Sequence, residues 1–305
     1  MDLIVQPADG ATRLIEAVEG AKKTVDIVIF RFDLKPLERA IEAAVKRGVA
    51  VRALIAHINS GGGRSLRQLE LRMLDAGVTV SRTGGDLVRY HGKLMIVDRD
   101  ELFVDGFNFT ARDLKSRSFG LVVKERRVVQ EALRLFEADS QREEFEPALD
   151  DGFVISPENA REQLAIFIKR AHKQLVIWDP KITDLQMIRL LQQRQKAGVD
   201  IRIIGKLGKR GGGLRAQKMP GLRLHVRAMV RDCDTAFVGS QSLRALELDA
   251  RREVGLIVRD GKVVKGMLET FEADWARTEL GQKELKVHEK ELKAAEKESA
   301  VEAAV

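Results

Sequence analysis

Apolar and polar positions alternate along the chain in two patterns, and each predicts a regular element. Residues 24–32 and 49–56 are short apolar runs rich in β-branched side chains, which is typical of buried strands. Residues 36–46 and 66–76 instead carry apolar side chains every three or four positions, which places them along one face of a helix. Strands that alternate with helices of this length predict an α/β protein with mainly parallel sheets.

The second half of the chain repeats this order of elements. With a shift of 150 residues, the segment 21–56 aligns with 171–206. Further along, the offset falls to 134 or 135 residues, and the letters Phe-Glu-Ala-Asp at 136–139 recur at 271–274. Several matches in the same order indicate a tandem duplication.

The duplication divides the chain into three parts. We expect two similar α/β lobes at residues 1–150 and 151–280, separated near 146–152 by a segment of linker-like composition. After Thr278 the chain consists mainly of Lys, Glu and Ala, so residues 281–305 are expected to form a charged tail that is helical or disordered.

Composition and charge narrow the class of protein. With 44% hydrophobic and 32% charged residues, the chain is neither collagen-like nor wholly disordered. A net charge of +7 favours anionic partners such as phosphate esters, nucleic acid or acidic lipid headgroups. The single cysteine, Cys233, excludes an intrachain disulfide, and the histidines lack metal-ligand spacing, so we expect neither a metal nor another cofactor. Without a visible signal peptide or a membrane-spanning apolar run, we expect a cytoplasmic protein that can associate with membranes through its surface.

The strongest chemical signal is the segment 91–98, in which His91 and Lys93 are two residues apart. If this segment is a strand, both side chains point to the same face. A histidine beside a lysine is a costly way to fill a core, because buried lysines are rarely unpaired. Asn108, on the strand that follows, can add an amide donor, so the segment predicts a cluster of donors around one potential nucleophile.

The same block recurs at 225–232 in the second half. His225 corresponds to His91, Arg227 to Lys93, Asp232 to Asp98 and Ser242 to Asn108. Two such elements can face each other across a pseudo-twofold axis, which would bring two histidines and two cations into one site.

The pattern H-x-K-x4-D, followed by a segment like G-S-x-N and present twice, resembles the signature of the phospholipase D superfamily. The resemblance covers nearly all of residues 1–280 and is closest to the bacterial phospholipase D-like and cardiolipin-synthase-like branch. It implies one active site at the lobe interface, where a phosphodiester of a phospholipid is hydrolysed or transferred to an alcohol. It also implies a phosphohistidine intermediate and no metal ion.

The resemblance assigns a role to each residue of the two motifs. Catalytic roles fall on His91, Lys93, His225 and Arg227, substrate binding on Asn108, Ser240 and Ser242, and supporting roles on Asp98, Asp232 and Glu253. The chemistry is physically reasonable, because cations offset charge on the nonbridging oxygens while one imidazole attacks and the other protonates the leaving alkoxide. We assign His91 as the nucleophile and His225 as the acid and base, and the sequence leaves the reverse assignment open.

Both halves depart from the signature. Arg227 replaces a lysine and Ser242 replaces the asparagine. In the first half Asp105 stands at the usual glycine position, and Glu253 aligns with Phe119 rather than with an acid. These departures keep two alternatives open: a nuclease of the same superfamily, suggested by the basic charge, and a catalytically weakened module that binds phosphate or lipid. The sequence also leaves the oligomeric state open.

Overall fold

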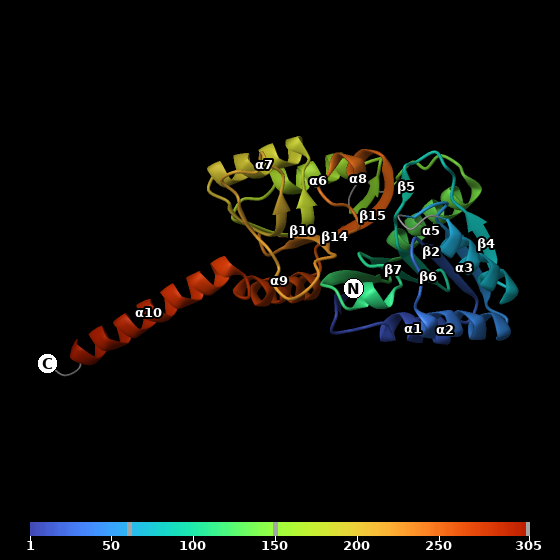
Figure 1. Cartoon of the computed structure of the whole chain (residues 1–305), viewed down its shortest axis with the longest axis horizontal. Coiled ribbons are helices and arrows are strands. Elements are labelled where there is room, and N and C mark those ends of the chain that lie inside the picture. The colour runs from blue at the N-terminus through green and yellow to red at the C-terminus, as the bar shows by residue number, and fades with distance from the viewer. Residues whose placement is uncertain (60–62, 149–151, 303–305) are drawn as a thin grey trace.

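The computed structural model describes residues 1–59, 63–148 and 152–302, with side chains described as far as residue 291. Two sheets lie face to face, and helices cover their outer faces (Figure 1). A further helix, α10 (Glu279–Glu302), extends away from the body and covers most of the predicted tail. The predicted lobe boundary at 150 and 151 lies outside the described residues.

The first sheet has seven strands and belongs to the first half of the chain. Its order is β1 (Asp2–Gln6), β8 (Ser118–Val123), β7 (Glu101–Asp105), β6 (Leu94–Val97), β2 (Thr24–Ile29), β3 (Ala50–Ile55) and β4 (Thr79–Arg82). Three helices pack on its outer face: α1 (Thr12–Gly20), α2 (Lys35–Lys46) and α3 (Arg64–Asp75). On its inner face lies α5 (Arg126–Gln141).

The second sheet repeats this arrangement. Its order is β12 (Arg215–Gln217), β11 (Asp200–Leu207), β10 (Gln174–Ile182), β13 (Arg227–Arg231), β14 (Thr235–Gly239), β15 (Arg251–Val258) and β5 (Arg89–Tyr90), and β9 (Phe153–Ser156) pairs with β15. Its helices are α6 (Ala160–Lys169), α7 (Leu185–Lys196), α8 (Ala245–Asp249) and α9 (Gly261–Ala276). The duplicated α/β fold predicted from the sequence is therefore confirmed.

The sheets are mixed, which corrects the expectation that they are mainly parallel. In the first sheet only the pairings of β2 with β3 and of β3 with β4 are parallel, and the other four pairings are antiparallel. One of these antiparallel pairings, β6 with β7, follows from a tight turn. Its residues Asp98 and Arg99 have φ values of 53° and 57°, and the connection is too short for the crossover that parallel strands need. Asp232 and Cys233 form the same turn in the second half, with φ values of 50° and 60°.

Asp98 and Asp232 each connect one of these turns to a neighbouring segment of the same half of the chain. The Asp98 carboxylate accepts hydrogen bonds from the backbone N–H groups of Lys22, Lys23 and Thr24, at 2.6–3.2 Å. Asp232 accepts the equivalent bonds from residues 172–174. Although partial burial opposes it, these bonds keep the pKa of both carboxyls below its ordinary value. Both aspartates therefore support the fold at the strand ends away from the motif histidines.

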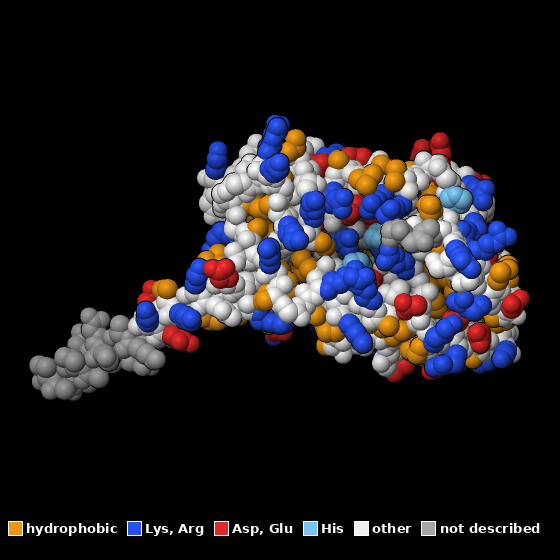
Figure 2. All heavy atoms as spheres, viewed as in Figure 1, with side chains coloured by type: hydrophobic (Ala, Val, Ile, Leu, Met, Phe, Trp, Pro, Cys, Tyr) orange, Lys and Arg blue, Asp and Glu red, His pale blue; other side chains and the backbone are white. Residues whose placement is uncertain are grey.

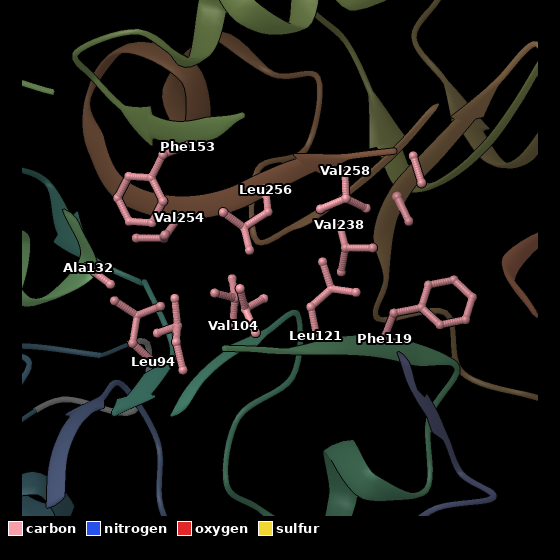
Figure 3. Packing of buried hydrophobic residues seen from close by; sticks show 14 of the residues in the cluster. Leu94, Val104, Phe119, Leu121, Ala132, Phe153, Val238, Val254, Leu256 and Val258 are labelled. Carbon is pink, nitrogen blue, oxygen red and sulfur yellow. The ribbon is translucent and has the colours of Figure 1, made fainter. Parts of the chain in front are cut away.

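One hydrophobic core joins the two halves (Figure 3). Leu94, Val104 and Leu121 of the first sheet lie opposite Val238 and Leu256 of the second, and all are at most 2% exposed. The inner helices α5 and α9 pack into the same core. The two sheets thus bury their inner faces on each other, which fixes the seam where the motif residues lie. Within the part of the chain that the structure describes, no helix is both long and apolar enough to cross a membrane.

Candidate active site

Each motif histidine follows a segment that pairs with the opposite half of the chain. β5 pairs in parallel with the start of β15, and the His91 N–H donates to the carbonyl of Arg252 at 2.7 Å. In the equivalent arrangement Leu224 forms an isolated parallel β-bridge with Arg117. The His225 N–H donates to the Arg117 carbonyl at 3.0 Å. The backbone of each half thus positions the histidine of the other, as the predicted pseudo-twofold arrangement requires.

The same two arginines form ion pairs with buried carboxylates across the seam. Arg117 makes a two-pronged contact with Asp274 of α9, at 2.8 and 2.9 Å. Arg252 contacts Asp139 of α5 at 3.1 Å. Planar guanidinium groups suit such paired contacts with carboxylates, so these pairs hold the strand ends beside the histidines in a defined orientation.

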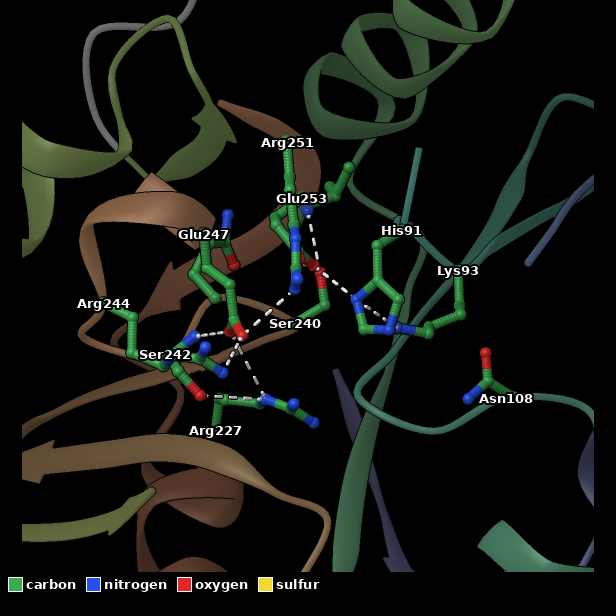
Figure 4. Close-up of polar contacts among 12 residues, drawn as sticks. His91, Lys93, Asn108, Arg227, Ser240, Ser242, Arg244, Glu247, Arg251 and Glu253 are labelled. Atoms are coloured by element: carbon green, nitrogen blue, oxygen red, sulfur yellow. Dashed lines mark hydrogen bonds and ion pairs between the residues drawn. The ribbon is translucent and has the colours of Figure 1, made fainter. Parts of the chain in front are cut away.

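His91 lies between a carboxylate and an ammonium group (Figure 4). Its Nδ1 is 2.7 Å from Oε2 of Glu253, which comes from the second half, and Lys93 Nζ is 2.9 Å from Nδ1 and 3.1 Å from Nε2. Burial lowers the pKa of His91 well below its usual value, and the charges of Lys93 and Arg227 act in the same direction. His91 is therefore neutral near pH 7, and an Nδ1–H donated to Glu253 would leave the Nε2 lone pair available.

Lys93 and Glu253 are both fully buried, and burial shifts the pKa of each group. Burial lowers the pKa of Lys93 to about 7, while Glu253 opposes the change. Burial raises the pKa of Glu253, which the charges of Lys93 and Arg227 oppose. Strongly perturbed groups that face one another at a seam are typical of functional sites.

His225 faces a carboxylate of the first half. Its Nδ1 is 3.5 Å from Oδ2 of Asp113, on the short helix α4 (Ala111–Leu114). Asp113 also accepts hydrogen bonds from the backbone and the side-chain amide of Asn108 and contacts Arg223 at 2.6 Å. Burial lowers the pKa of His225 well below its usual value, Arg227 lowers it further, and Asp113 opposes both.

Arg227 is the cation of the second half. Its Nε donates to the Ser242 hydroxyl at 3.3 Å and lies 4.0 Å from Glu247, which also contacts Arg251. Because the charge of Arg227 lowers the pKa of both histidines, it acts on both sides of the seam. Ser240 is fully buried, and its hydroxyl hydrogen-bonds the backbone of Val254 on β15.

The structure adds site residues that the sequence analysis did not select. Asp113 and Glu247 each stand five residues after a motif position, Asn108 or Ser242, and each accepts a hydrogen bond from that residue's backbone N–H. This duplicated spacing was the available signal. Arg223 and Arg251 complete the set through their contacts with Asp113 and Glu247.

The register of the sheets corrects one alignment. Asp105 pairs with Gly120 in the first sheet, and Gly239 pairs with Gly255 in the second. Glu253 therefore corresponds to Ser118, two residues before Gly120, and not to Phe119. The Ser118 hydroxyl donates to the carbonyl of His225 at 2.9 Å, so the first half has a backbone contact where the second half has an acid.

The segment that carries His91 and Lys93 is also not the strand that was expected. Residues 91–93 lie between β5 and β6, and the strand begins at Leu94. The two side chains nevertheless converge, because the chain passes from one sheet to the other at this point.

The motif histidines are buried but not sealed. Each is 8% exposed, and Figure 2 shows histidine side chains between the lobes with Lys and Arg side chains around them. A hollow of about 430 Å³, lined by Arg31, Phe32 and Arg112 among others, reaches Asp113 beside His225. Over the described residues, no group of three or more His, Cys, Asp and Glu side chains is arranged to hold a metal ion.

The Asp105 carboxyl group is buried and has no hydrogen-bonding partner among the described residues. It is 1% exposed, and among the described residues neither carboxylate oxygen has a hydrogen-bond partner. Burial raises the pKa of Asp105 well above its ordinary value, and only Lys93 opposes this. Between its unfolded and folded pKa values, the folded state keeps a proton that the unfolded state loses, so this group makes stability fall as pH rises.

We expect the variant Asp105→Asn to lack that loss of stability. The difference in the free energy of unfolding between this variant and the wild type should grow from pH 4 upward. It should increase by as much as about 1.4 kcal/mol per pH unit, up to the pKa that Asp105 has in the folded protein. Urea unfolding at pH 4.5, 6 and 8 measures it, with Asp100→Asn as the exposed control from the same hairpin. Parallel stability curves for Asp105→Asn and wild type would contradict the expectation.

Comparison with known proteins identifies the family of the chain. The family described as "Cardiolipin synthase, PLD-like domain" matches residues 14–140 and 164–275, so both halves and most of the chain are covered. The chain belongs to the phospholipase D superfamily, whose members are phosphodiesterases, as the resemblance of its duplicated motif predicted.

Three individual proteins that are similar to this chain have sequence identities of 30% or less. Mitochondrial cardiolipin hydrolase of Mus musculus is 30% identical over 139 residues, which are 45% of this chain and 59% of that protein. The chain thus spans little more than half the length of this relative. Phosphatidylserine synthase of Haemophilus influenzae has a similar fold, with a TM-score of 0.68 and 11% identity over 90% of this chain and 86% of that one. Polyphosphate kinase of Porphyromonas gingivalis gives a TM-score of 0.74 and 18% identity over 89% of this chain and 46% of that one.

Proposed function

We propose that the protein is a phospholipase D-type phosphodiesterase that cleaves a phospholipid diester, or transfers its phosphatidyl group to an alcohol, through a phosphohistidine. The observation that carries the proposal is the crossed arrangement at the seam. His91 faces Glu253 of the second half, His225 faces Asp113 of the first, and the charges of Lys93 and Arg227 reach both histidines.

The first step is attack by Nε2 of neutral His91 on phosphorus. The bond from phosphorus to the leaving oxygen breaks, and the imidazolium of His225 gives its proton to the departing alkoxide. Lys93 and Arg227 offset the charge that builds on the nonbridging oxygens. In the second step neutral His225 takes a proton from water or an alcohol, whose oxygen attacks the phosphoryl group and releases His91.

The lowered pKa values of His91 and His225 have different consequences for the two proposed roles. A neutral His91 is the form that can attack. His225 must carry a proton, and burial disfavours that charge in the empty site. A phosphodiester bound beside it brings a negative charge into a poorly solvated site, which would raise the pKa of His225 together with Asp113. Substrate binding would thereby prepare the acid.

Substrate choice tests the proposal. We expect the wild type to release the alcohol from vesicles of phosphatidylglycerol or cardiolipin, with and without a chelator of divalent cations. Single- and double-stranded oligonucleotides assayed at low salt form the second arm, because nucleic-acid binding weakens steeply as salt rises. Preferential cleavage of oligonucleotides would indicate that the substrate is a nucleic acid and not a lipid. Vesicle binding with no product would indicate a binding module. Peripheral contact with the bilayer is part of this proposal, and co-sedimentation with the vesicles measures it.

A further inference from the structure

A second cavity lies at the far ends of the strands that carry the second half of the site. β13 begins at Arg227 and ends at Arg231, while β15 begins beside Glu253 and ends at Val258. Around the ends distant from the histidines is a cavity of about 290 Å³ that Arg170, Arg231 and Arg259 line. The mechanism proposed above uses none of these three arginines.

Arg231 is the buried member of this arginine group. It is 8% exposed, its guanidinium lies 5.0 Å from the Phe167 ring centre, and it donates to the Phe167 carbonyl at 3.3 Å and to the Thr235 hydroxyl at 3.1 Å. A guanidinium has five N–H donors, so two acceptors leave donors over. Among the described residues no carboxylate oxygen lies within 4.0 Å of it. A buried charge without a counter-ion is costly, which makes this arginine unusual.

No neighbouring acid among the described residues pairs directly with Arg231. Arg170 and Arg259 are exposed and form no ion pair among the described residues, and their charges lower the pKa of Arg231 together with burial. Asp232 and Asp234 act in the opposite direction, but Asp232 binds backbone N–H groups and Asp234 accepts from the Thr235 hydroxyl. Glu125 lines the same cavity and, over the residues that the structure describes, forms no ion pair with an arginine.

The first half of the chain shows that the fold does not require these arginines. The positions equivalent to Arg170, Arg231 and Arg259 are Gly20, Val97 and Lys124. Val97 is buried in an ordinary core, and Lys124 pairs with Glu101 at 3.3 Å. The arginine group is thus a property of the second half alone, although the two halves share their framework.

We propose that this cavity is a binding site for a phosphate-bearing anion, separate from the two-histidine site. Guanidinium forks match the oxygens of a phosphate group, and a phosphate bound among the three arginines would supply the counter-charge that Arg231 lacks among the described residues. The chemical class is a phosphomonoester, either on a small soluble molecule or on a lipid headgroup. The apolar walls at Phe167 and Ile257 leave room for a small organic part beside the phosphate.

The test compares two pairs of arginines that carry the same charge. In Arg170→Gln/Arg259→Gln the two exposed members are removed while buried Arg231 stays, so the fold should be kept. The control, Arg99→Gln/Arg189→Gln, removes two exposed charges elsewhere. Inorganic phosphate and glycerol 3-phosphate are titrated calorimetrically into the full chain, and vesicles with phosphatidic acid are tested by co-sedimentation.

We expect one class of phosphate site from this cavity in the wild type and in the control, and a second class if the two-histidine site binds phosphate as the proposed function requires. In the variant Arg170→Gln/Arg259→Gln, called the cavity variant, the affinity of the cavity for phosphate should fall at least about tenfold. The turnover of the diester should stay unchanged. Tungstate soaked into wild-type crystals should give an anomalous peak beside Arg231. Binding of soluble phosphates identifies a soluble ligand and binding of vesicles alone identifies a lipid headgroup, provided that the cavity variant loses it. Phosphate binding with the same number of sites and the same affinity in Arg170→Gln/Arg259→Gln as in the control would overturn the proposal, whether or not the histidines prove catalytic.

Discussion

Alanine in place of His91 is expected to abolish diester cleavage and to prevent any phosphoryl-enzyme from forming. In the proposed mechanism Nε2 of His91 forms the bond to phosphorus, and Lys93 beside it cannot replace an imidazole as the nucleophile in the same geometry. Turnover should fall by at least about 10³-fold, the order expected when a group that forms the covalent intermediate is lost. Acid quenching of the enzyme with a diester labelled at phosphorus measures the intermediate directly.

Alanine in place of His225 should have a different result. Natural diesters have poor leaving groups that need a proton, so their cleavage should be lost as in His91→Ala. A diester with a nitrophenol leaving group needs no proton, so His225→Ala should release one burst of nitrophenol and then stop. The label should accumulate on His91, because no base remains to activate water.

The comparison between the two variants therefore decides which histidine is the nucleophile. His172→Ala, at an exposed histidine outside the motifs, is the matched control and should keep full activity. If the burst appears in His91→Ala and not in His225→Ala, the roles are reversed. If both variants keep full activity, the seam is not the catalytic site.

Much of the fold could be predicted from the sequence because helices and repeats leave periodic traces. The predicted helix at 36–46 is α2, and the one at 66–76 is α3. The predicted strand at 24–32 is longer than β2, since apolar residues continue past the last strand residue into the seam. Periodicity thus identified these elements better than it identified their ends.

The direction of the strands could not be predicted in the same way. A buried strand is a run of apolar residues whether its neighbours are parallel or antiparallel. The turn that sets the direction contains Asp98 and Arg99 in the left-handed region, where Asn or Gly would have been a clearer signal. The motif pattern also gave no warning that residues 91–93 connect two sheets.

The duplicated motif selects the histidines and cations proposed for the site, and Glu253 is selected with them as a supporting residue, whereas Asp113 is not selected. Glu253 and Asp113 each contact a histidine of the opposite half, and the local sequence does not show which residues meet across the seam. The shift of offset from 134 to 135 residues also hid the correspondence of Ser118 with Glu253. Only the sheet register resolves a difference of one residue.

The variant Glu253→Gln should lower kcat by about 10²–10⁴-fold while the fold is kept. The carboxylate accepts from Nδ1 of His91 at 2.7 Å and so favours the tautomer whose Nε2 is free to attack. An amide of the same shape can present an N–H to Nδ1 instead, which places the imidazole proton on Nε2 and removes the nucleophile. KM should change much less than kcat, since the amide leaves the shape of the site unaltered.

The pH profile of Glu253→Gln separates positioning from a merely structural role. Glu253 opposes the loss of the proton from Lys93, whose pKa burial lowers to about 7. Without the carboxylate the pKa of Lys93 should fall further, so the alkaline limb of residual activity should move to lower pH. Glu272→Gln, at an exposed partner of Arg202, is the control for the substitution itself and should leave the profile unchanged.

Asp113→Asn supplies the matching variant for the other histidine. Because Asp113 faces His225, its loss should impair the steps that need an acid or base and leave the burst from a nitrophenyl diester nearly intact. Glu253→Gln should suppress that same burst, since it acts on the nucleophile. If both variants lose the burst equally, or if neither alters the pH profile, the two acids do not divide between the two histidines as their geometry predicts.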